Sequence, residues 1–114
     1  MSTGPHLDRR TFLRASAAGL MGAGLGLGLF RLRAAEASRD TARARAERAR
    51  AAFDQAHRDR ERADELGREG LRSPEERERA ILGEVTAAAE LDAARHAVEV
   101  AVSEVAEARA ALLS

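Results

Sequence analysis

The sequence predicts an all-α protein in which two long helices form an antiparallel hairpin, or coiled coil, behind a further N-terminal helix. Three observations support this fold class. Residues 34–66 contain no Pro or Gly and consist almost entirely of Ala, Arg, Glu and Asp, which favour helix. Apolar residues from Ala87 to Leu112 recur at alternating spacings of four and three. Only about six residues separate the two segments, and so short a connection favours antiparallel packing.

The first 37 residues have the three parts of a secretory signal peptide. Residues 1–14 form a basic n-region and residues 15–30 an uncharged h-region. Residues 31–37 form a c-region that ends in Ala35-Glu36-Ala37, so we expect cleavage after Ala37. The h-region has 16 residues, five of them Gly, whereas a membrane-spanning helix needs about 20. These features favour a removable signal over a permanent anchor.

The n-region resembles a twin-arginine (Tat) signal peptide. Arg9 and Arg10 match the paired arginines of that motif, and Phe12 and Leu13 match its two apolar positions. Asp8 stands where the motif has Ser or Thr. The resemblance covers about the first third of the chain. It implies export to the periplasm or cell envelope, with the Tat translocase as a transient partner and a passenger that folds before export.

An uncleaved inner-membrane anchor is the alternative for this segment, which would then be the protein's contact with the membrane. The pairs Gly22/Gly26 and Gly24/Gly28 would give it small-residue faces for helix packing. The sequence contains no Cys, which excludes a lipoprotein anchor and disulfide bonds.

The remaining residues, 38–114, are predicted to form one helical hairpin, with helices at 38–66 and 74–113 and a loop at 67–73. Gly67 is expected to be the glycine that terminates the first helix. Ser73 is a good N-cap for the second helix, Pro74 suits its first position, and Glu76 completes a capping-box pattern. In the first helix one Ala column repeats every seven residues: Ala35, Ala42, Ala49, Ala56 and Ala63.

The hairpin is expected to expose apolar surface, because the second helix has far more large apolar side chains than the first. Long Arg stems from the first helix could cover part of this surface. Otherwise it would bind a second copy of the chain or another exported protein. The sequence-predicted partner surface consists of Val98, Val100, Val102 and Val105.

Composition and motifs argue against several other functions. Residues 38–114 carry 14 Arg and 17 acidic residues, and a mildly acidic chain is a poor binder of nucleic acid. No nucleophile, base and cleft are suggested together, so we expect neither an enzyme nor a cofactor. His57 and His96 each have acidic neighbours that could join them in binding zinc, nickel or copper. In an antiparallel hairpin the two lie about 20 Å apart, so we expect no shared metal site.

The function predicted from sequence is therefore that of a Tat-exported, non-enzymatic helical protein. It would act through protein–protein contact as an accessory or structural subunit that can self-associate. The alternative is a periplasmic heavy-metal sensor or a chaperone-like hairpin, to which the chain has only an architectural similarity.

Overall fold

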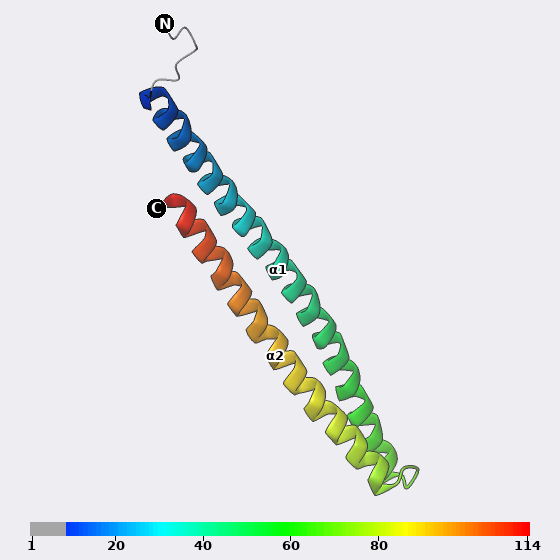
Figure 1. Cartoon of the computed structure of the whole chain (residues 1–114). Helices are drawn as coiled ribbons and strands as arrows, with labels where there is room; N and C mark the ends of the chain where they lie inside the picture. Colours follow the sequence, from blue (N-terminus) through cyan, green and yellow to red (C-terminus); the bar gives the residue numbers. More distant parts are fainter. Residues whose placement is uncertain (1–8) are drawn as a thin grey trace, which may run out of the picture.

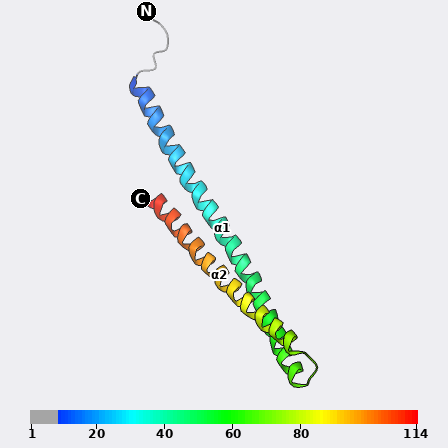
Figure 2. The same cartoon turned by 60° about the horizontal axis from the view of Figure 1, so that its bottom comes forward.

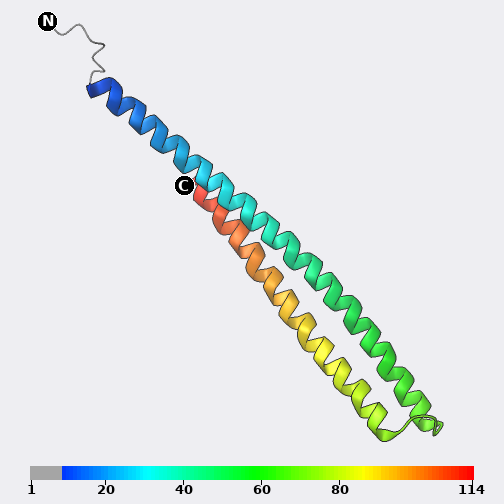
Figure 3. The same ribbon diagram turned by 45° about the vertical axis from the view of Figure 1, so that its right-hand side comes forward.

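The computed structural model describes residues 9–114, with side chains from residue 24 onwards, and consists of two long antiparallel helices (Figure 1). Helix α1 spans Arg9–Arg68 and helix α2 spans Pro74–Leu113. No strand occurs in residues 9–114. Two further views show the same rod, in which α1 extends well beyond the end of α2 (Figures 2 and 3). The predicted all-α helical hairpin is confirmed.

Helix α1 continues without a break through the boundary that the sequence predicted after Ala37. Its composition explains this continuity, since residues 34–66 contain no helix-breaking Pro or Gly. Arg50 and Asp54, four residues apart on one face of α1, form an ion pair at 3.2 Å that further stabilises the helix. Thus the c-region and the first helix of the expected hairpin form one continuous element.

The end of α1 is set by Gly70, so the expectation that Gly67 would terminate the helix is wrong. Gly70 has φ +75°, a left-handed conformation that glycine adopts without steric cost. The backbone N–H of Leu71 donates to the carbonyl of Leu66 at 2.8 Å, and that of Gly70 donates to the carbonyl of Gly67 at 3.1 Å. This pair of bonds is a Schellman motif, and it places Gly67 inside the last helical turn.

Helix α2 begins as the sequence predicted. Ser73 has extended backbone angles and is the N-cap, and its hydroxyl accepts a hydrogen bond from the backbone N–H of Glu76 at 3.2 Å. Pro74 occupies the first helical position, where no N–H is needed. Glu75 and Glu76 place negative charge at the positive end of the helix dipole.

The two helices meet along a seam of buried and half-buried residues with alternating spacings of four and three. On α2 the seam comprises Ala80, Glu84, Ala87, Leu91, Ala94, Val98, Ala101, Val105, Ala108 and Leu112. On α1 it comprises Gly28, Leu32, Ala35, Arg39, Ala42, Ala46, Ala49, Phe53, Ala56, Arg60, Ala63 and Gly67. The seam thus extends from the h-region to the turn.

The core within this seam is thin. Of the seven buried hydrophobic residues in the described part of the chain, five are Ala, and Leu91 and Val105 are the two large ones. Burying a Leu or Val side chain contributes roughly 1.5–3 kcal/mol, and small residues let the helices approach closely without adding much buried area. A two-helix hairpin with so small a core is marginal by itself.

Candidate functional site

The end of the h-region and the c-region pack against the last third of α2. Glu36 and Arg109 form an ion pair at 3.7 Å across the helices. Closer to the N-terminus, the Leu112 side chain fills the space beside Gly28, where an added Cβ would lie 2.5 Å from Leu112 Cδ2. A groove between the helices is lined from both sides by Phe30, Arg31, Ala34, Ala35, Ser38, Glu104, Glu107 and Ala108. The contact is therefore continuous across the expected cleavage point.

Three further observations concern the predicted signal segment. Arg9, Arg10, Phe12 and Leu13 lie outside the residues whose side chains the structure describes. Ala37 lies within α1 with its side chain exposed, while its neighbours Ala35 and Glu36 are half-buried. Within the described part of the chain, no helix has a stretch long and apolar enough to cross a membrane.

A polar cluster occupies the half of the hairpin nearer the turn. Arg60 and Glu84 are both seam positions, and Arg60 Nη1 donates to Glu84 Oε1 at 2.9 Å. The other carboxylate oxygen of Glu84 lies 3.0 Å from His57 Nδ1. His57 Nε2 lies 3.1 Å from Glu61 Oε1, so each ring nitrogen faces a carboxylate. The His57 ring also stacks on Phe53, with ring centroids 6.1 Å apart.

This geometry favours the charged form of both His57 and Glu84. The hydrogen bond to Glu84, together with the nearby charge of Glu61, holds the pKa of His57 above its ordinary 6.5. The same hydrogen bond and the Arg60 guanidinium hold the pKa of Glu84 below its ordinary 4.5. Arg60 and Glu84 can pair in the seam in only one register of the two helices, because sliding one helix by a heptad would separate the two charges. The cluster therefore fixes the alignment of the helices.

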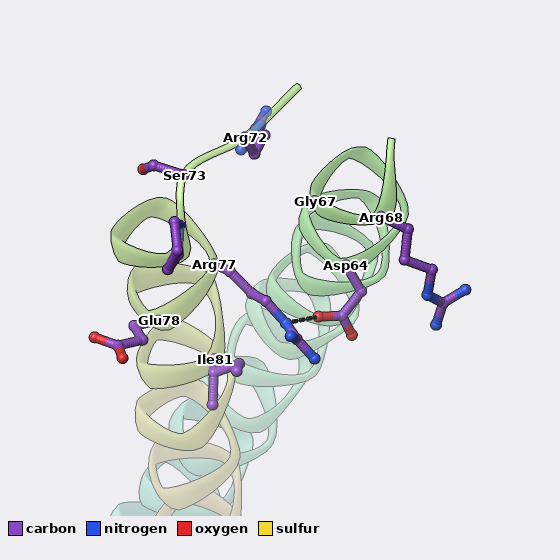
Figure 4. A pocket seen from close by; sticks show the side chains of 9 residues that line it. Asp64, Gly67, Arg68, Arg72, Ser73, Arg77, Glu78 and Ile81 are labelled. Atoms are coloured by element: carbon purple, nitrogen blue, oxygen red, sulfur yellow. Dashed lines mark hydrogen bonds and ion pairs between the residues drawn. The ribbon is translucent and has the colours of Figure 1, made fainter. Parts of the chain in front are cut away.

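Beside the turn, a further cross-helix ion pair reinforces this alignment. Arg77 Nε donates to Asp64 Oδ1 at 2.7 Å (Figure 4). The pair lies in a shallow hollow whose other lining residues come from the end of α1, the turn and the start of α2. Both charges of the pair are thereby engaged across the hairpin, as expected of a structural contact.

His57 and His96 do not converge on a common ligand. His57 faces Glu84, on α2, whereas His96 has Glu99 at 3.6 Å on its own helix. Within the described residues, no group of three His, Cys, Asp or Glu side chains has the arrangement of a metal site. The polar cluster places opposite charges in mutual contact across the two helices, which favours one register.

The four residues of the sequence-predicted partner surface do not share one face. Val105 is only 4% exposed and lies in the seam with the half-buried Val98. Val100 and Val102 are exposed, at 47% and 42%. Residues two apart on a helix point about 200° apart, so these two flank opposite sides of α2. An approaching protein would meet Val100 or Val102, but not Val105.

Two features of the site were missed from the sequence, although a signal for each was present. Glu84 lies three residues before Ala87 and so continues the α2 spacing toward the turn. Leu32 and Gly28 continue the α1 spacing in the other direction from Ala35. Neither was expected in the seam, because Glu84 is charged and Gly28 and Leu32 lie in the expected signal segment, although the four-three period continues through them.

These features define a class of protein, an all-α antiparallel hairpin with an alanine-rich seam. Comparison with known proteins adds no closer assignment: no family model, curated protein or solved structure matches the chain.

The first prediction concerns the pH dependence of the His57–Glu84 contact. The pKa of His57 is raised in the folded state. Its contribution to the stability of the fold is therefore complete below the pKa of the unfolded chain, near 6.5, and is lost as the pH rises through the pKa of the folded state. The pKa of Glu84 is lowered in the folded state. Its contribution to stability is therefore present above the ordinary pKa of about 4.5 and is lost as the pH falls through the pKa of the folded state. The hairpin should be most stable between these limits.

Urea unfolding of the full chain can be followed by circular dichroism. The urea concentration at the midpoint of unfolding should decrease as the pH is raised from about 6 to 8. The variant His57→Gln should flatten this slope. His96→Gln is the matched control, since His96 is well exposed on the outer surface, and it should retain the slope. An unchanged slope in His57→Gln would contradict the assignment.

Proposed function

We propose that this protein is a Tat-targeted, non-enzymatic helical hairpin of the cell envelope that retains its N-terminal segment and acts through protein–protein contact. The observation that carries the proposal is the seam, which runs from Gly28 to the turn across the expected cleavage point. A signal that packs as part of the folded hairpin is suited to remain attached.

Cleavage after Ala37 would require this part of the hairpin to open. Proteases act on exposed, locally unfolded segments, whereas Ala35–Ala37 are helical and Glu36 is paired with Arg109. Removal of residues 1–37 would also take away the seam residues Gly28, Leu32 and Ala35. The groove that Phe30 to Ser38 form with Glu104 to Ala108 would lose nearly all of one wall. The retained form keeps this end of α2 covered.

The thin core supports a function through contact with other proteins. With Leu91 and Val105 as its large buried side chains, the hairpin gains little from its own packing. Association with a second hairpin to form a four-helix bundle would bury further apolar area, and twofold pairing is the commonest symmetry of such assemblies. An accessory or structural subunit that self-associates fits this requirement.

The second prediction concerns targeting and processing. The wild-type protein should fractionate with the membrane at its full intact mass, and its turn should be cut by protease added outside spheroplasts. The double variant Arg9→Lys, Arg10→Lys should leave the turn protected inside the cell, because the translocase reads the arginine pair. A mature N-terminus at Ser38 would contradict retention. Unaffected export of the double variant would contradict the Tat assignment.

The third prediction concerns self-association. Val102→Glu adds a charge at a position that is 42% exposed, so the hairpin itself should tolerate it. Sedimentation of the full chain in density-matched detergent should show a dimer for wild type and a smaller mass for the variant. Thr86→Glu adds the same charge at another exposed position of α2 and should leave the dimer intact. A wild-type protein that sediments as a stable, fully helical monomer would contradict self-association.

A further inference from the structure

At one end of the rod α1 runs past the last turn of α2 (Figures 1 and 3). Exposed large apolar side chains gather there. Within the described residues, ten such side chains are exposed, and half of them lie at this end. Those five are Leu25, Leu27, Leu29, Phe30 and Leu113, with exposed fractions between 55% and 89%. The other five are distributed over the turn and the length of α2, where no comparable group forms.

The four exposed residues on α1 are spread over about 200° of the helix circumference rather than along a narrow stripe. Leu25, Leu27 and Leu29 follow one another at steps of about 200°, and Phe30 adds a further step of about 100°. All four are more than half exposed. A protein partner that packs on one face would leave several of them in water, whereas lipid covers a helix from every side. The arrangement therefore favours a bilayer over a protein as the occupant.

The last turn of α2 lies at the same level along the rod. Leu112 packs beside Gly28, and the groove at this end is lined by Gly24, Leu25, Leu27, Gly28, Arg31, Ala111, Leu112 and Ser114. Because Gly28 has no side chain, Leu112 fits against the α1 backbone and the two helices stay close. Any environment that surrounds residues 24–30 of α1 must therefore also meet the last turn of α2.

On both helices, charged side chains begin at about the same level along the rod. Residues 15–30 and 110–114 contain no charged side chain. Toward the turn, the first charged residues beyond them are Arg31 on α1 and Arg109 on α2, and Arg33 lies two residues after Arg31. Arginine at the border of an apolar segment suits the anionic phosphates of lipid headgroups, toward which its long stem can extend. The apolar end of the rod thus has a basic rim formed by Arg31 and Arg33 on α1, whereas Arg109 on α2 is paired with Glu36.

We propose that the last turn of α2, residues 110–114, inserts into the interfacial layer of the bilayer beside the h-region of α1. This inference rests on the proposed function, because it requires the N-terminal segment to stay attached. The hairpin is then held at the membrane at two points. Since α1 is a single helix as far as Arg68, the rod stands out from the membrane, with its turn roughly 55 Å beyond Arg31 at 1.5 Å per residue.

Single tryptophans test this insertion, because the sequence contains no Trp. The full chain would carry Leu113→Trp, Leu25→Trp or Val100→Trp and would be reconstituted into vesicles of phosphatidylcholine and phosphatidylglycerol with brominated acyl chains. Val100 is exposed on the same helix, about 20 Å from Leu113. Leu25→Trp reports attachment of the N-terminal segment, and circular dichroism checks that each variant keeps its helicity.

We expect blue-shifted emission and several-fold quenching for the Trp at 113 and at 25, with neither effect at 100. Quenching at 25 without quenching at 113 would overturn the insertion of α2 while leaving attachment of the N-terminal segment in place. Absence of quenching at both positions would overturn attachment and insertion together. A blue shift at 113 without quenching would show burial against protein rather than lipid, and would also overturn the inference.

Discussion

The close approach of two helices along an alanine-rich seam is the constraint on which the rest of the structure depends. Alanine at 87, 94, 101 and 108 alternates with larger side chains on α2, and a matching alanine column follows α1. Such a seam gives geometric fit but little buried area, because each Ala contributes only one methyl group. The hairpin therefore depends on the length of the seam, and each turn of helix that extends it contributes to stability.

This dependence on length explains why the N-terminal segment matters for the fold. Gly28, Leu32 and Ala35 cover about the last two turns of the α2 seam, and Glu36 adds the ion pair with Arg109. At the opposite end, Arg60 and Glu84 replace an apolar layer with a charged one that gains hydrogen bonds and fixes the register. The apolar contacts supply attraction along the rod, whereas the charged layer decides which residues face each other.

The sequence was sufficient to predict the parts of the fold that depend on local chemistry. The Ser73 cap, Pro74 and the four-three spacing from Ala87 onwards all match the structure, since each depends on neighbours in the same helix. Gly67 was expected to end the first helix, but Gly70 does so, because both residues suit a helix end and the hydrogen bonds of the turn decide between them. The Glu84–His57 contact depends on the opposite helix, which local patterns do not specify.

The central claim is that the end of the h-region and the c-region are part of the folded hairpin. Because the chain contains no Cys, introduced cysteines can test this directly in the full-length protein. Ala34→Cys with Glu107→Cys places two exposed thiols in one groove, whereas Ala34→Cys with Glu90→Cys moves the second about 25 Å along α2. If the hairpin is folded as described, a short bifunctional maleimide should cross-link the two cysteines readily within the first double variant and not within the second. Equal cross-linking of the two pairs, or none in the first, would contradict the claim.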